Sequence, residues 1–299
     1  MGKIAFVFAG QGDQHPGMGK ELAERYPAAA RIFEMCDRLR PGTSQQCFSG
    51  TEDELKDTRN TQPCLFAMEM AAAAVLMDAG VEPSAVAGIS LGEVVAAAAG
   101  GTFELEDGFR LVCLRGELMQ READKFDTTM AAVVKLAPER VEELCAQFEG
   151  VYPVNYNCPG QITVSGLAAQ MPAFSAAVKE AGGRAIPLKV RAAFHSPFMK
   201  GAAPEFREAV LRARSGPQSA VLYSNMTGEP YTGDVAGLLS EQIYHPVLWE
   251  KIIRNMMAAG IDTFIEMGPG RTVTNIIKKI DPSANAVTYA EYLGEVGAC

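Results

Sequence analysis

The stretch Ala85-Val86-Ala87-Gly88-Ile89-Ser90-Leu91-Gly92 decides the fold of this chain of 299 residues. Its apolar beginning, 85–88, predicts a short buried strand, and the alanine- and valine-rich run 91–99 predicts a helix that ends at Gly100-Gly101. A serine with a glycine two residues away on either side, between a strand and a helix, is typical of a nucleophile elbow. The stretch therefore predicts an α/β fold with Ser90 as the candidate nucleophile.

Further strands and helices are predicted on both sides of the elbow. The run Ile4–Phe8 predicts a buried strand that leads into a tight loop at Gly10-Gln11-Gly12. Near the C-terminus, 263–266 predicts a strand, followed by a structural turn at Gly268-Pro269-Gly270 and a final helix. Helical periodicity predicts further helices at about 63–80, 106–121, 197–214 and 236–259.

The middle of the chain has a different pattern. Strand-like and helical segments follow one another there at 130–134, 138–148, 151–157, 161–165, 167–181 and 185–190. The resulting order, β-α-β-β-α-β, is that of a ferredoxin-like unit. We therefore expect an α/β-hydrolase-like large subdomain, made of 1–127 and 191–299, with a small ferredoxin-like subdomain, 128–190, inserted into it.

Composition excludes several classes of function. The formal net charge of −9, without a stripe rich in Lys and Arg, argues against nucleic-acid binding. The seven cysteines show no C-x-x-C spacing, which favours a reducing compartment and predicts no metal site. No apolar run is long enough to span a bilayer, and the first is too short for a secretion signal. We expect a cytoplasmic protein that binds neither nucleic acid nor membrane.

A serine hydroxyl becomes a useful nucleophile when a base takes its proton and fixed donors stabilise the oxyanion. The amide of Leu91, at the start of the predicted helix, is one such donor. Three histidines are candidates for the base: His15, His195 and His245. We favour His195 because it lies between a strand-like run and a helix that starts with proline, where α/β enzymes place catalytic groups.

Eight ordered segments carry a family resemblance. They are Phe8-Ala9-Gly10-Gln11-Gly12, Thr61-Gln62-Pro63, Gly88-Ile89-Ser90-Leu91-Gly92-Glu93, Arg110-Leu111-Val112 with Arg115-Gly116-Glu117-Leu118-Met119, Val154-Asn155-Tyr156-Asn157 with Pro159-Gly160-Gln161, Phe194-His195-Ser196, Pro246-Val247 with Trp249, and Glu266-Met267-Gly268-Pro269-Gly270. Over nearly the whole chain, they resemble the malonyl-CoA:acyl-carrier-protein transacylases and the acyltransferase domains of polyketide synthases.

The resemblance implies a reaction and its participants. A malonyl group would pass from malonyl-CoA to the phosphopantetheine thiol of an acyl carrier protein, by a ping-pong mechanism through a serine ester. The resemblance implies that Ser90 carries the malonyl ester and that His195 is the general base. It implies that the backbone amides of Gln11 and Leu91 form the oxyanion hole and that Arg115 pairs with the malonate carboxylate. It places Asn155 and Asn157 near the substrate. Either asparagine alternatively caps a turn. We expect no permanently bound cofactor and a monomer.

The sequence departs from the family at two positions. Ile89 precedes the serine, where the family usually has histidine, and an apolar branched side chain there is expected to alter acyl preference or rate. Leu248 stands where many members have Gln or Arg. In the family, a backbone carbonyl in this region orients the base. A backbone group is not lost when the side chain changes, so we expect Leu248 still to orient His195. Ala193-Phe194-His195 resembles the Phe-His form of malonyl-specific polyketide acyltransferases, which implies a preference for malonyl over methylmalonyl.

Other functions stay open at this point. They are a polyketide acyltransferase that acts in trans, a serine thioesterase or hydrolase on the same scaffold, and a degenerate member that only binds carrier proteins. A cation at Arg115 argues against a hydrolase of neutral acyl chains. Since carrier proteins are typically acidic, docking on this acidic chain needs a local basic patch. The candidates are Arg184, Lys189, Arg191 and Lys200, which are alternatively scattered solvated charges.

Overall fold

Five parallel strands form the larger of two sheets in the computed structural model, which describes residues 2–296. Their order across the sheet is β7-β2-β1-β8-β9. The bounds are β1 (Lys3–Phe8), β2 (Ala85–Gly88), β7 (Val221–Leu222), β8 (Ile261–Glu266) and β9 (Asn285–Thr288). Parallel strands buried on both faces need apolar residues throughout, and β1 and β2 meet this requirement with runs of buried alanine, valine and phenylalanine.

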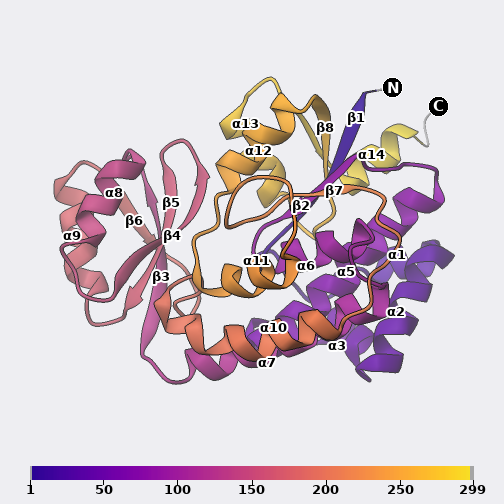
Figure 1. Ribbon diagram of the computed structural model, residues 1–299, viewed down its shortest axis with the longest axis horizontal. Helices are drawn as coiled ribbons and strands as arrows, with labels where there is room; N and C mark the ends of the chain where they lie inside the picture. Colours follow the sequence, from indigo (N-terminus) through magenta and orange to yellow (C-terminus); the bar gives the residue numbers. More distant parts are fainter. Residues whose placement is uncertain (1, 297–299) are drawn as a thin grey trace.

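Helices cover both faces of this sheet (Figure 1). Phe6 and Phe8 of β1 point into a core shared with α5, α6 and α7, whereas Ala5 and Val7 point into a core shared with α12 and α13. The helices of this part are α1 (Lys20–Arg25), α2 (Pro27–Leu39), α3 (Thr43–Ser49), α4 (Glu52–Lys56), α5 (Thr58–Asp78), α6 (Leu91–Ala99), α7 (Leu105–Ala123), α10 (Ala203–Arg212), α11 (Val235–Glu241), α12 (Trp249–Ala258), α13 (Thr272–Ile280) and α14 (Tyr289–Val296).

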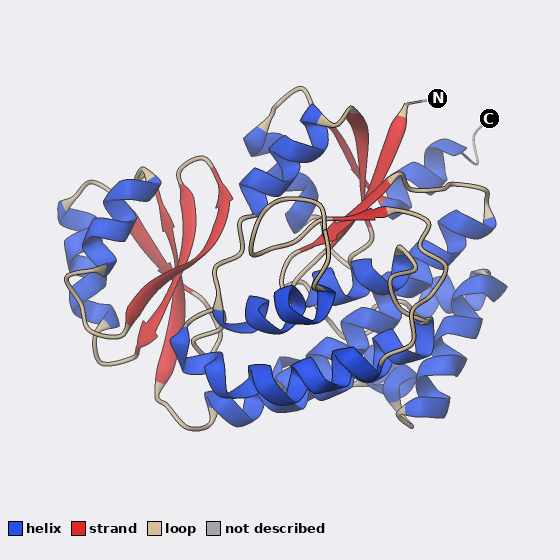
Figure 2. Ribbon diagram, in the orientation of Figure 1, coloured by secondary structure: helices blue, strands red, loops and turns tan. Residues whose placement is uncertain are grey.

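The second sheet is antiparallel and lies to one side of the molecule (Figure 2). Its order is β4-β5-β3-β6, which is the order of a ferredoxin-like unit. Its elements are β3 (Thr128–Val134), α8 (Pro138–Cys145), β4 (Val151–Cys158), β5 (Gln161–Leu167), α9 (Met171–Glu180) and β6 (Arg184–Pro187). The predicted fold class, a large α/β part with a small ferredoxin-like insertion, is confirmed. The residue boundaries of the two subdomains stay a prediction.

Three element predictions need correction. Helix α5 begins at Thr58, five residues before the predicted start at 63, because Asp57 caps it and Pro63 is tolerated inside it. The helix predicted over 236–259 is two helices, α11 and α12, separated by a short 3-10 helix (Gln242–Tyr244) and an extended segment. Within that segment Val247 pairs with the backbone of β4, which a continuous helix cannot do. Helix α13 is also not the last element, since β9 and α14 follow it.

The helix lengths and compositions bear on membrane association. Among the described residues, no helix is both long and apolar enough to cross a bilayer. The same residues hold no cluster of histidine, cysteine or acidic side chains suited to a metal ion.

Candidate active site

Ser90 sits on a strained turn between β2 and α6. Its backbone has φ +58° and ψ −106°, a region that side-chain-bearing residues rarely adopt, so the fold holds the residue there against a local cost. An added Cβ at Gly88 would overlap the backbone of Gly92, and one at Gly92 would lie 2.5 Å from the carbonyl oxygen of Phe8. Both glycines of the motif are therefore required by close backbone approach, as the elbow prediction implies.

His195 contacts the Ser90 hydroxyl directly. Its Nε2 lies 2.6 Å from Ser90 Oγ, and its Nδ1 lies 2.8 Å from the carbonyl oxygen of Gln242 and 3.2 Å from that of His245. A carbonyl can only accept, so Nδ1 carries the proton and Nε2 is left to accept one from the serine. His195 is almost fully buried and also has a positive φ, +61°. The geometry is that of a serine–histidine pair oriented by backbone carbonyls.

The other two histidines do not reach the serine. His15 is exposed, and His245 places its ring against the Glu241 carbonyl while only its backbone faces His195. The prediction that Leu248 orients the base is wrong. The Leu248 amide donates to Asn225, its carbonyl accepts from the α12 backbone, and the two carbonyls that accept from His195 come from residues 242 and 245.

Among residues 2–296, no carboxylate contacts the His195 ring. The arrangement is thus a dyad, which disfavours a Ser–His–Asp hydrolase triad. Burial and the nearby Arg115 cation lower the pKa of His195 to about 4. The ring is therefore neutral, and able to accept a proton, at physiological pH.

Arg115 of α7 approaches the serine from the protein interior. The side chain has no solvent exposure, and its Nη2 lies 3.2 Å from Ser90 Oγ. Nη2 also donates to Gln242 Oε1 (2.8 Å) and Nη1 to Gln62 Oε1 (3.1 Å), but the buried Nε has no partner within the described part of the chain. Burial lowers the pKa of Arg115 to about 10, which leaves the guanidinium charged at neutral pH. A buried cation with spare donors is suited to an anionic ligand.

A buried carboxyl group, Glu93, lies behind this cation. It follows Ser90 by one turn of α6 and has no solvent exposure. Its oxygens accept hydrogen bonds from the Tyr231 hydroxyl (2.6 Å), the Asn225 amide (2.9 Å) and Gln242 Nε2 (2.7 Å). Burial raises the pKa of Glu93 to about 7, and these three hydrogen bonds act in the opposite direction.

Sequence reasoning assigned no role to the residues that surround the pair. Asn225 accepts from the Ser90 amide (2.7 Å) and donates to the Gly88 carbonyl (2.6 Å), and so fixes the elbow from both sides. Gln62 and Glu93 lie within segments that carry the family resemblance, so their positions were a signal. Asn225 and Gln242 lie outside those segments, and nothing in the sequence pattern pointed to them.

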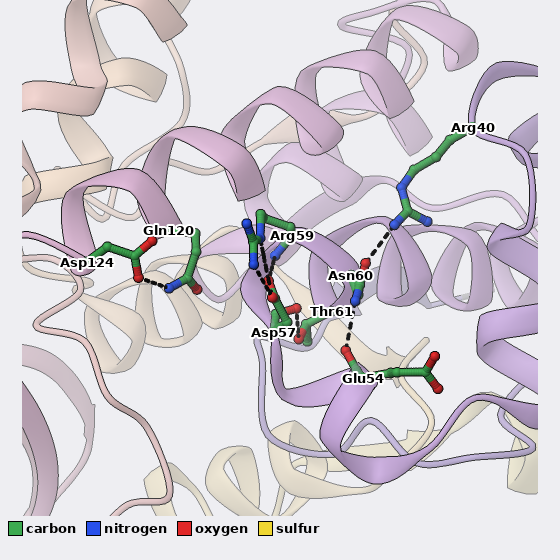
Figure 3. A network of polar contacts seen from close by, with 8 residues as sticks. All are labelled: Arg40, Glu54, Asp57, Arg59, Asn60, Thr61, Gln120 and Asp124. Carbon is green, nitrogen blue, oxygen red and sulfur yellow. Dashed lines mark hydrogen bonds and ion pairs between the residues drawn. The ribbon is translucent and has the colours of Figure 1, made fainter.

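The first turn of α5, which precedes Gln62, is held by polar contacts of Asp57, Arg59 and Asn60 (Figure 3). Asp57 caps the helix by accepting from the Arg59 amide, and Asn60 is fixed between Arg40 (2.7 Å) and the Glu54 carbonyl (3.0 Å). These contacts anchor the first turn of α5. The next turn then presents Gln62 to Arg115 and to Gln11, whose Oε1 accepts from Gln62 Nε2 at 3.2 Å.

The loop after β1 closes against the elbow. An added Cβ at Gly10 would lie 3.1 Å from the Ile89 carbonyl oxygen, so the loop backbone passes directly beside the residue before the serine. Neither the Gln11 amide nor the Leu91 amide donates to another group of residues 2–296. Leu91 begins α6, where backbone N–H groups lack helical partners. Two free backbone donors beside the nucleophile fit a developing oxyanion.

A cleft of about 270 Å³ opens at the serine. Asn155 and Asn157 line it from β4, two residues apart and so on the same face, and Asn157 donates to Thr163 of β5 (3.1 Å). Both asparagines belong to a strand, so neither caps a turn. The remaining lining residues are Ala9, Gly10, Gln11, Gly12, Asp13, Ile89, Ser90, Met130, Ala132, Gln161, Thr163, Leu188, Val190, Phe194, His195, Thr272, Val273 and Ile276. The cleft thus lies between the two sheets.

The four predicted basic patch residues, Arg184, Lys189, Arg191 and Lys200, are all exposed. Lys189 and Arg191 flank Val190, which lines the cleft. Within the described range, none of the four forms an ion pair with an acidic side chain of the protein. Their charges are therefore not neutralised by ion pairs among residues 2–296, and two of them, Lys189 and Arg191, lie beside the cleft.

Comparison with known proteins agrees with this geometry. Residues 5–297 match the acyl transferase domain family. A Bacillus subtilis protein named malonyl CoA-acyl carrier protein transacylase is 37% identical, with 97% of this chain and 94% of that protein covered. The solved Clostridium perfringens protein of the same name is 33% identical with a TM-score of 0.94, covering 99% of this chain and 98% of that one.

A second solved structure bears on partners. It is a malonyl-transacylase in complex with a type II polyketide acyl-carrier protein, 30% identical with a TM-score of 0.90, covering 96% of this chain and 94% of that one. The serine elbow, the histidine held by backbone carbonyls and these similarities over nearly the full length agree with one another. The chain belongs to the malonyl CoA-acyl carrier protein transacylase family of acyl transferase domains.

Proposed function

We propose that this protein transfers a malonyl group from malonyl-CoA to the phosphopantetheine thiol of an acyl carrier protein, through an ester on Ser90. The names of the full-length relatives support the reaction. One feature of the chain itself carries the choice of acyl group: the buried Arg115 guanidinium, 3.2 Å from Ser90 Oγ, with Nε still unpartnered. A neutral acyl chain has no use for such a cation, whereas the free carboxylate of malonate pairs with it.

The first half-reaction loads the serine. His195 Nε2 takes the proton of Ser90 Oγ as the oxygen attacks the thioester carbonyl carbon. The carbonyl oxygen becomes an oxyanion, which the amides of Gln11 and Leu91 stabilise. When the intermediate collapses, the carbon–sulfur bond breaks and the histidine returns its proton to the leaving CoA sulfur. The malonyl group stays on Ser90 with its carboxylate at Arg115.

The second half-reaction unloads the serine in the reverse sense. The phosphopantetheine thiol gives its proton to His195 Nε2 and attacks the malonyl ester. The bond to Ser90 Oγ then breaks, and the serine recovers the proton. In both halves the imidazolium that forms is stabilised through Nδ1–H by the carbonyls of Gln242 and His245, which act where a triad would use a carboxylate.

The cleft supports roles for the remaining predicted residues. Asn155 and Asn157 present side-chain amides to a substrate that enters along β4. Lys189 and Arg191, exposed beside the cleft, offer an acidic carrier protein a local attraction against the net charge of −9. The protein so described acts as a cytoplasmic monomer that needs no resident cofactor.

Steady-state kinetics with a carrier protein as acceptor test the function. The values of kcat/KM for malonyl-CoA, methylmalonyl-CoA and acetyl-CoA are compared at saturating carrier. We expect malonyl-CoA to be preferred over both others. A preference for acetyl-CoA, or thioester hydrolysis that outpaces transfer to the carrier, would contradict the proposal and favour a neutral-acyl transferase or a thioesterase.

A further inference from the structure

The Glu93 side chain bonds to neither Ser90 nor His195, yet two of its three hydrogen-bond partners, Asn225 and Gln242, do. Its Oε1 accepts from the Tyr231 hydroxyl and the Asn225 amide, and its Oε2 accepts from Gln242 Nε2. Every partner is thus a donor toward it. An ionised carboxyl can accept from all three at once, whereas an amide in the same place has one accepting and one donating end.

The contact with Gln242 fixes which way its amide faces. Gln242 Nε2 points to Glu93 and to the Ser90 carbonyl oxygen, both at 2.7 Å. Its Oε1 therefore points to Arg115 Nη2, at 2.8 Å. If the amide turned over, Nε2 would face the guanidinium and Oε1 would face two acceptors. The carboxylate of Glu93 consequently determines the environment of the cation.

The arrangement also leaves the cation unsaturated. Arg115 forms no ion pair with any carboxylate among residues 2–296, although it is fully buried. A direct carboxylate partner would occupy the guanidinium edge that a substrate needs. The side-chain amide of Gln242 lies between Glu93 and Arg115, so Glu93 balances the positive charge of Arg115 without contacting it. The guanidinium therefore keeps N–H donors for a ligand.

We infer that Glu93 is a positioning residue for charged acyl groups: through the Gln242 amide it makes Arg115 present its guanidinium to the carboxylate of the substrate. The inference rests on the proposed malonyl transfer and adds to it a determinant of acyl selectivity outside substrate contact. Replacement of Glu93 by glutamine keeps the shape of the side chain but puts its NH2 group against either Gln242 Nε2 or the backbone amide of Asn225. In the first case the Gln242 amide turns over, and in the second the Asn225 amide loses its acceptor.

The experiment compares Glu93→Gln with Tyr231→Phe in the full chain. Tyr231→Phe removes one hydrogen bond to Glu93 but keeps the carboxylate and its contact with Gln242, which makes it the matched control. Transfer to carrier protein is measured at about pH 8 with malonyl-CoA and with acetyl-CoA. We expect Glu93→Gln to lower the malonyl-to-acetyl ratio of kcat/KM about tenfold or more, mainly through a higher KM for malonyl-CoA, and Tyr231→Phe to keep the wild-type ratio.

Folding is checked by circular dichroism and thermal melting. If Glu93→Gln does not fold, Gln242→Met takes its place, since it keeps Glu93 and removes only the intervening amide, and the same fall in the ratio is expected. A folded variant with the wild-type ratio, or with equal losses for both thioesters, overturns the inference and leaves the proposed function standing. A wild type that transfers no malonyl group overturns the proposed function itself, before any variant is measured.

Discussion

Arg115 Nη2 lies 3.2 Å from Ser90 Oγ, on the protein side of a hydroxyl whose other neighbour is His195 Nε2 at 2.6 Å. The serine is thus placed between a cation and a base. The cation helps to keep the base neutral, since it lowers the pKa of His195. It also lies within reach of a carboxylate one methylene group beyond an ester on the serine, which links the chemistry of the site to its selectivity.

Replacement of Arg115 is expected to change selectivity more than reactivity. Arg115→Ala removes the charge-assisted hydrogen bonds to malonate, and we predict a fall in kcat/KM for malonyl-CoA of about a hundredfold or more. The loss for acetyl-CoA is expected to be smaller, because that acyl group has no carboxylate. Steady-state kinetics with both thioesters measure this. Arg121→Ala, on the same helix but exposed and paired with Glu205, is the control. Equal losses for both thioesters would contradict the role.

His195 is expected to make folding stability depend on pH. Its pKa is about 4 in the folded protein, against about 6.5 in an unfolded chain, so only the unfolded form binds its proton between these values. Stability is therefore lost as pH falls from 6.5 to 4. Over that range we predict that the wild type loses about 3 kcal/mol relative to His195→Gln. Denaturant unfolding of both proteins at several pH values measures the difference, and parallel pH profiles would disprove it.

Ile89 gives a prediction about the departure from the family pattern. Its amide donates to the Phe8 carbonyl (3.0 Å), while its side chain packs on the apolar core that β1 shares with α12 and α13. Ile89→His keeps the backbone bond, so we expect Ser90 still to be acylated, with a loss of about 1–2 kcal/mol in stability. Ile89→Val serves as the conservative control. Urea unfolding and acylation assays test this, and a folded His variant that cannot be acylated would refute it.

The basic patch gives a prediction about the carrier protein. Charge reversal at Lys189 and Arg191 is expected to raise the KM for the carrier about tenfold at low salt, because it replaces attraction by repulsion at the cleft mouth. Loading of Ser90 from malonyl-CoA is measured separately and should not change. Lys179→Glu, an exposed charge reversal on the outer helix α9, is the control for charge reversal away from the cleft. If transfer to the carrier is unaffected by the double reversal, the carrier docks elsewhere.

The local part of this site could be predicted from the sequence, and the long-range part could not. The elbow at Ser90 is set by glycines two residues away, and the ferredoxin-like order by the alternation of short segments, so both leave a pattern along the chain. His195 could be placed in a strand-to-helix loop but not proven against His245. Its contact with Gln242 arises only because the helix predicted over 236–259 is interrupted.

The same limit explains the misplaced orienting group and the missed residues. Leu248 lies close to His245 in sequence, but the carbonyls face the base only where the chain turns out of the 3-10 helix. Asn225 contacts Ser90 although 135 positions separate them along the chain, and Gln242 contacts Glu93 across 149 positions. Contacts at such separations depend on how α6 and the 220–245 region pack together, and hydrophobic periodicity carries no information about the polar partners.

The acyl-enzyme at Ser90 is tested most directly by intact-protein mass measurement after incubation with malonyl-CoA in the absence of carrier. We predict that the wild type gains the mass of one malonyl group, that Ser90→Ala gains none, and that addition of holo carrier protein removes the gain from the wild type. A wild type without an adduct, or an equal adduct on Ser90→Ala, would contradict the central role given to Ser90.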